Sequence, residues 1–187
     1  MSIWPTGTNQ YLLNQVALSN SIRRIWVNNN QWIRALVYSI LFQLGDQDAI
    51  QARLEQNADD LAALFAQFYG QSVGGRIRQN YLIYIRALTA LIEAYRTNDA
   101  SAIADQRQTL YEVADQFAQI LSEINRYWDR ATLQAVIYGL VNFTETQILR
   151  ILAGDYAQSI QEYDEFMDQA YHFSDDLTFG ILKQFQV

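Results

Sequence analysis

Apolar residues recur at spacings of three and four along most of the chain, which is typical of helices that bury one face. Strand-like alternation is rare, and the only proline is Pro5, so nothing later in the sequence breaks a helix. The pattern predicts six helices. They cover roughly residues 19–44, 47–69, 73–97, 100–124, 129–153 and 156–185.

A Gly or Asn stands directly before an Asp at three expected helix junctions, Gly45-Asp46, Asn98-Asp99 and Gly154-Asp155. Gly and Asn tolerate the left-handed conformation that ends a helix, and Asp caps the next one. Such short connections produce antiparallel hairpins. The similar spacing of the three pairs fits either an internal repeat or the same kind of turn formed independently at each junction. We therefore predict an all-α, single-domain up-and-down helical bundle of about six helices arranged as three antiparallel hairpins.

A chain of 187 residues suits one compact domain. Residues 1–18 are expected to form an N-terminal extension, and residues 19–187 the helical bundle domain. Looser segments are expected to join the hairpins, at residues 70–75 and 125–128, because the first is rich in Gly and neither fits the helical pattern.

Composition narrows the function classes. The net charge is −7, which argues against binding nucleic acid or anionic lipid. No apolar run approaches the ~18 residues that suggest a membrane span, and the first 20 residues are too polar for a signal peptide. We expect a cytoplasmic protein that contacts neither nucleic acid nor membrane.

Familiar catalytic and metal chemistry is not expected. There is no Cys and one histidine, His172, so paired Glu-x-x-His motifs and a HExxH zinc site are excluded. Every Ser-His-acid triad would have to use His172, and no such arrangement can be proposed. The neighbouring carboxylates Asp59-Asp60 and Asp175-Asp176 point about 100° apart on a helix and do not form one site. Residues 70–75 lack the Lys and Ser/Thr of a phosphate-binding loop. The chain is predicted to have no catalytic residue, metal ligand or cofactor.

Asn29 interrupts the apolar stripe of the first predicted helix, between Trp26 and Ile33. A buried Asn without partners costs about 1–3 kcal/mol. It is either a polar group lining a ligand pocket or a device that specifies packing. Three other helices carry apolar and aromatic stripes that fit a plain core. These are Tyr81, Tyr84, Leu88, Leu91 and Tyr95; Leu133, Ile137, Leu140, Phe143 and Ile148; and Ile160, Tyr163, Met167, Tyr171, Ser174 and Leu177.

Short motifs spread over the chain after residue 20 resemble a family of short bacterial all-helical proteins of unsettled function. Some members of that family are labelled acetylglutamate kinase, but no phosphate-binding loop supports that label here. The motifs are Trp26 with Trp32-x-Arg34, Arg53-Leu54-x-Gln56-Asn57, Tyr69-Gly70, Ala114-Asp115, Asn125-x-x-Trp128, Thr144-Glu145, Gly154-Asp155, Tyr163-Asp164 and Gly180-Ile181-x-Lys183-Gln184-Phe185.

The resemblance also shows a departure. Members of that family often carry inward histidines on four helices, and the matching positions here are Asn29, Tyr84, Leu140 and Met167. If relatives bind a metal through these histidines, this chain looks like a diverged member that has lost metal binding. The amide of Asn29 and the thioether of Met167 are poor ligands for common divalent ions. With Trp32, the residues at these four positions form the candidate lining of a central pocket.

The sequence therefore predicts a non-enzymatic protein that binds a small apolar molecule in the bundle core. One alternative is a structural or interaction protein that forms a homodimer through its aromatic residues. Others are a diverged relative of a metal-binding helical bundle, and an enzyme that uses Tyr, Asp or Glu of the pocket.

Overall fold

The computed structural model describes residues 8–186, with side chains from residue 12 onward. In this range the chain is entirely helices and turns, which confirms the all-α, single-domain bundle. The six helices are α1 (Thr8–Leu41), α2 (Gln47–Tyr69), α3 (Gln71–Thr97), α4 (Ala100–Ile124), α5 (Arg130–Leu152) and α6 (Tyr156–Phe185).

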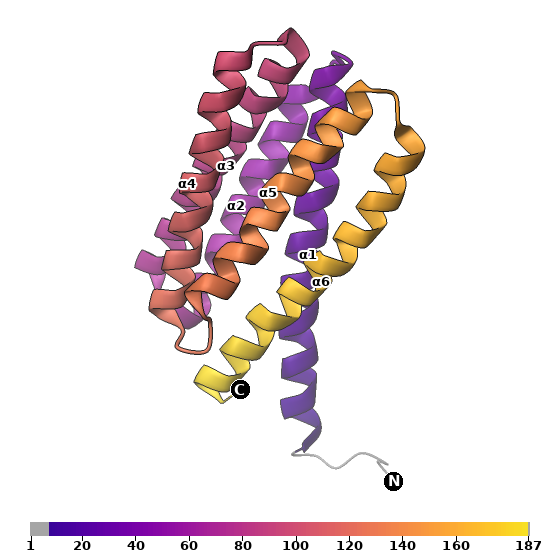
Figure 1. Cartoon of the computed structure of the whole chain (residues 1–187). Helices are drawn as coiled ribbons and strands as arrows, with labels where there is room; N and C mark the ends of the chain where they lie inside the picture. Colours follow the sequence, from indigo (N-terminus) through magenta and orange to yellow (C-terminus); the bar gives the residue numbers. More distant parts are fainter. Residues whose placement is uncertain (1–7, 187) are drawn as a thin grey trace.

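Each helix packs against the next one in the chain, and α1 also packs against α3, α5 and α6. Helices α2, α3 and α4 lie on one side of the bundle and α6 on the other, with α1 and α5 between them (Figure 1). Because α1 touches four other helices, its inward face lines the centre of the molecule. None of the described helices is long and apolar enough to cross a membrane.

Helix α1 begins at Thr8 rather than near residue 19, so much of the expected N-terminal extension is helical. Its first turns run past the other helices (Figure 1), and Leu12, Leu13 and Val16 are exposed there. The difference has a simple cause. Apolar periodicity marks where a helix is buried, and the burial of α1 begins with Ile22.

The three tight junctions share one geometry. Each has a residue in the left-handed conformation, Gln43, Asn98 or Gly154. The amide after each of them donates to the carbonyl five positions earlier at 2.9 Å, a helix-ending motif with a 6→1 bond. The first junction differs from the prediction, because Gln43 and not Gly45 takes the left-handed conformation and α1 ends earlier.

The predicted Asp caps are present at only one of these junctions. Asp99 accepts a hydrogen bond from the amide of Ala102 at 3.0 Å. Asp46 and Asp155 make no such bond. Ser39 donates to Asp46 at 2.8 Å, and Arg150 pairs with Asp155 at 3.2 Å, so both carboxylates are bound to the preceding helix instead.

The prediction of a loose segment at residues 70–75 is wrong. Only Gly70 separates α2 from α3, and residues 71–75 are helical. Gly74 lies against α2 so closely that a Cβ there would be 2.7 Å from the carbonyl oxygen of Ala62. The glycine that suggested flexibility therefore allows close helix packing.

The second expected loose segment is non-helical, as predicted, but side chains at both of its ends hold it in place. Asn125 donates to the hydroxyl of Tyr69 at 2.8 Å. The buried indole of Trp128 donates to the carbonyl of Asp176 at 3.2 Å and occupies the space beside Gly180. This segment joins the end of α2 to α6.

The predicted stripe of α6 is partly wrong. Ile160 and Tyr171 are exposed, whereas Ser174 and Leu177 are buried as expected. The buried face is shifted by one residue and includes Phe166, Ala170 and Phe173. Because α6 carries apolar residues on both of its sides, the sequence alone did not determine which face is buried.

A charged cluster ties α3, α4 and α5 together. Tyr95 and Arg107 both donate to the carboxylate of Glu145, with Arg107 Nε 3.0 and 3.1 Å from its two oxygens. Burial raises the pKa of Glu145, but the bonds from Arg107 and Tyr95 outweigh it and hold the pKa below its ordinary value.

Glu145→Gln is expected to cost about 1 kcal/mol at pH 7, a modest value because Arg107 is exposed enough for solvent to screen the pair. Because the pKa of Glu145 is lower in the folded state than in the unfolded state, the ionised carboxylate stabilises the fold at pH values above its ordinary pKa. This contribution is lost as the pH falls through the lowered pKa of the folded state. The difference between wild type and variant should therefore shrink below about pH 5. Urea unfolding across pH 3–7 would measure it, with Glu55→Gln, at an exposed carboxylate, as control. A difference independent of pH would contradict the assignment.

Candidate ligand-binding cavity

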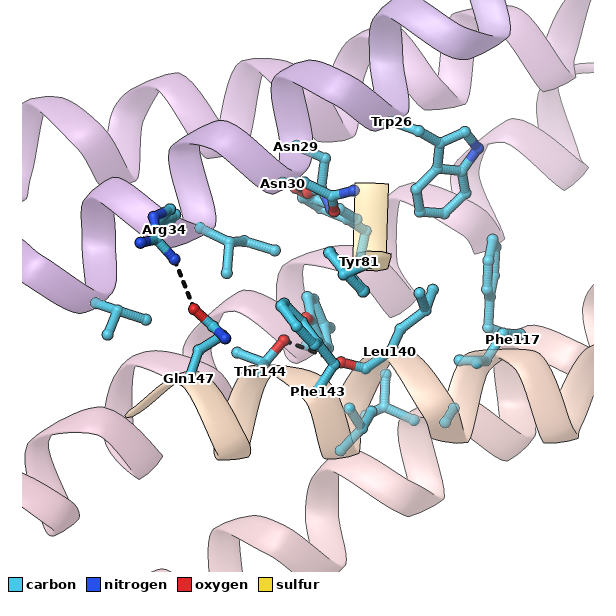
Figure 2. Close-up of a pocket in the computed structure, with 18 of the residues that line it drawn as sticks. Trp26, Asn29, Asn30, Arg34, Tyr81, Phe117, Leu140, Phe143, Thr144 and Gln147 are labelled. Atoms are coloured by element: carbon cyan, nitrogen blue, oxygen red, sulfur yellow. Dashed lines mark hydrogen bonds between the residues drawn. The ribbon is translucent and has the colours of Figure 1, made fainter. Parts of the chain in front are cut away.

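A cavity of about 80 Å³ lies at the centre of the bundle, between α1, α3, α4, α5 and α6, and Leu61 of α2 also lines it. For scale, an apolar protein cavity of about 150 Å³ binds benzene. Its walls are mostly apolar and aromatic, and the lining contains no Asp, Glu or His. Figure 2 shows Trp26 and Phe117 at one end, Asn29 and Tyr81 in the middle, and Arg34 at the other end.

Three of the five residues predicted to line a pocket surround this cavity: Asn29, Tyr84 and Leu140. Trp32 is not in the lining. Its half-buried ring faces α2, with the guanidinium of Arg53 5.9 Å from the ring centre. Met167 is also outside the lining, since the buried face of α6 is shifted by one residue and Phe166 takes that place.

Asn29 finds its partners within the protein. The buried Tyr81 hydroxyl donates to Asn29 Oδ1, and Asn29 Nδ2 donates to Asn30 Oδ1 at 3.3 Å. Asn30 in turn lies with Nδ2 3.8 Å from the sulfur of Met167. The short chain of polar groups satisfies Asn29 without a ligand, so the buried amide links α1 to α3.

Two tyrosines of the lining stay protonated at neutral pH. Burial raises the pKa of Tyr84 to about 12, and burial also raises the pKa of Tyr81. Their hydroxyls can donate hydrogen bonds but cannot serve as bases near pH 7. With no carboxylate or imidazole in the lining, the cavity suits binding better than acid–base catalysis.

Arg34 brings a positive charge to one end of the cavity. Its guanidinium donates to Gln147 at 2.6 Å, to Ser159 at 3.3 Å and to Tyr38 at 3.4 Å. It also lies 4.6 Å from the ring centre of Tyr163. All four partners are neutral.

Three buried donors in the cavity lining have no hydrogen-bond partner among the described residues. They are the indole nitrogen of Trp26, the amide nitrogen of Gln147 and the hydroxyl of Tyr163. Gln147 and Tyr163 both contact Arg34, whereas Trp26 lies at the other end (Figure 2). The unpaired donors therefore concentrate beside Arg34.

Sequence reasoning missed the Arg34 end of the cavity. Arg34 entered only as part of a shared motif, and Gln147 and Ser159 not at all. The available signal was polar residues at inward spacing, Arg34 four residues after Asn30, and Gln147 three after Thr144.

Other candidate groups lie away from this cavity. His172 is exposed on α6, and among the described residues no group of three His, Cys, Asp or Glu is arranged to hold a metal. Trp26 and Trp128 are buried and Trp32 is half-buried, so these three indoles pack inside the bundle and do not form a surface patch.

The fold and cavity define an all-α bundle with one polar and one aromatic end to its central cavity. Comparison of the chain with family models, curated proteins and solved structures found no match. The resemblance to the histidine-bearing bacterial family therefore stays a prediction from the motifs.

Proposed function

We propose that the protein binds a small, mainly apolar molecule in the central cavity. The observation that carries the proposal is an apolar cavity of about 80 Å³ whose lining includes three unpaired buried donors. Ligand sites commonly combine apolar walls with a few polar groups.

The energetics support such a role. An unfilled cavity of this volume costs about 2 kcal/mol at the usual ~24 cal/mol per Å³. Each buried donor without a partner costs a further ~1–3 kcal/mol. A molecule that fills the space and accepts hydrogen bonds from these donors would recover part of both terms.

Thermal unfolding with a panel of small apolar compounds tests the proposal. At a concentration one hundred times its Kd, a ligand adds about 2.7 kcal/mol. For a chain of this size that raises Tm by about 5–10 °C. Leu140→Trp, which replaces an aliphatic side chain of the lining with a larger indole ring, should abolish the shift.

Leu149→Trp is the matched control, because Leu149 lies on the same helix but is 49% exposed. This variant should keep the full shift in Tm. The proposal fails if no compound stabilises the wild type, or if stabilisation is the same in Leu140→Trp.

A further inference from the structure

Resting on the proposed function, we propose that the ligand is a short-chain carboxylic acid, with its carboxylate bound by Arg34 and its apolar chain in the cavity. In this proposal the polar end of the site binds the carboxylate, and the apolar end limits the length of the ligand's apolar chain.

The first support is the uncompensated charge of Arg34. Within the described part of the chain, no carboxylate lies within 4.0 Å of its guanidinium. Arg107 and Arg150 are held by Glu145 and Glu162, respectively. A partly buried charge is favourable when an opposite charge pairs with it, and a carboxylate matches the planar fork of Arg.

The second support is the orientation of Gln147, which is only 4% exposed. Its Oε1 accepts from Arg34 at 2.6 Å and from the hydroxyl of Ser159 at 2.7 Å. Turning the amide over would place its NH₂ against a guanidinium, so the two bonds fix its orientation. Nε2, buried and unpartnered in the cavity lining, is left as a donor beside the positive charge.

The third support is the Tyr163 hydroxyl, also buried and unpartnered. Burial raises the pKa of Tyr163, which keeps the hydroxyl protonated and able to donate. Guanidinium, amide and hydroxyl are all donors, whereas a carboxylate is purely an acceptor with about four lone-pair sites. The chemistry of this end thus matches an anion with two oxygens.

The walls and volume of the cavity determine what the rest of the ligand can be. The stacked rings of Phe143 and Phe166, with centres 3.8 Å apart, line the cavity together with Leu140 and Ile33. A volume of 80 Å³ holds about three water-sized groups, which corresponds to a chain of about three carbons beyond the carboxylate. Arg34 is the only cation that the described residues contribute to the lining, which suits a singly charged carboxylate better than a phosphate.

Titration calorimetry of the full chain with butanoate, butanamide and 1-butanol at pH 7 tests the head group. We expect butanoate to bind at least tenfold more tightly than either neutral analogue. Arg34→Met should remove this preference, whereas Arg24→Met, at an exposed arginine of the same helix, should keep it.

Gln147→Glu provides a second variant that does not depend on losing a charge. It places a carboxylate next to Arg34 and replaces the Nε2 donor with an acceptor, so the charge of Arg34 is paired within the protein. The variant should therefore have a higher Tm and should no longer bind butanoate. A lowered Tm together with unchanged butanoate binding would overturn the assignment.

The outcomes separate this inference from the proposed function. Equal affinity for butanoate and 1-butanol, or a butanoate preference that survives Arg34→Met, overturns the carboxylate site and leaves apolar binding standing. Failure of all three compounds and of the apolar panel overturns both.

Discussion

Gly180→Ala is expected to lower the free energy of unfolding by about 3 kcal/mol, the upper end of the usual cost of overpacking. A Cβ at this position would lie 1.9 Å from Nε1 of Trp128 and 2.5 Å from the adjacent ring carbon. The indole is rigid and 5% exposed, so it must leave its site. It would lose its bond to Asp176 and its contact with Phe65. Chemical denaturation measures the change.

Gly139→Ala is the matched control, because this glycine is inside α5 and a Cβ added there would meet no neighbouring atom within 4 Å. It should raise stability by about 0.5–1 kcal/mol, the usual gain when Ala replaces Gly in a helix. The double variant Gly180→Ala with Trp128→Leu should lose less than the sum of the single variants, since the clash is removed with the ring. Similar stability changes for Gly180→Ala and Gly139→Ala would contradict the proposed fit between Gly180 and Trp128.

Trp26→Ala is expected to lower the free energy of unfolding by about 3–5 kcal/mol, the usual cost of removing a large buried ring. Trp26 forms one end of the cavity and packs on Phe173, with ring centres 5.0 Å apart. Its removal enlarges the cavity. Free indole should therefore raise the Tm of Trp26→Ala and have little effect on wild type, as measured by thermal unfolding.

Trp26→Phe separates the ring from its nitrogen. The indole N–H has no hydrogen-bond partner among the described residues, so the variant also removes an unsatisfied donor. We expect a cost of no more than about 1.5 kcal/mol, as for other modest changes of core shape. If Trp26→Phe is as destabilising as Trp26→Ala, the nitrogen has a partner and the cavity end is incorrectly described.

The helices themselves were largely predictable. Periodicity and junction residues gave the observed bounds of α2, α4 and α6 and placed both ends of α5 within one residue, since local sequence decides where a helix ends. The joint at residues 125–128 is non-helical as expected, although Trp128 fixes it to α6. The error concerns Gly74, which was expected in a loose segment but lies inside α3 against α2. A glycine that permits a turn and one that permits close packing look the same in sequence.

The cavity was predictable only in part. Asn29 stood out because it breaks an apolar stripe, and it does line the cavity. Its partner Tyr81 lies on another helix, so whether the amide is satisfied was invisible in the sequence. Arg34 entered only as part of a shared motif, and its importance depends on having Gln147 and Tyr163 beside it without a carboxylate among the described residues.

The sequence by itself determined the helical bundle, the junction at Asn98-Asp99 and the inward position of Asn29, because helix periodicity and capping act within a few residues. Only the tertiary structure decided the rotation of α6, the fit of Trp128 over Gly180 and the group of donors around Arg34. These depend on contacts between residues far apart in the chain. A difference of one residue in helix register, as between Phe166 and Met167, changes which side chain reaches the centre.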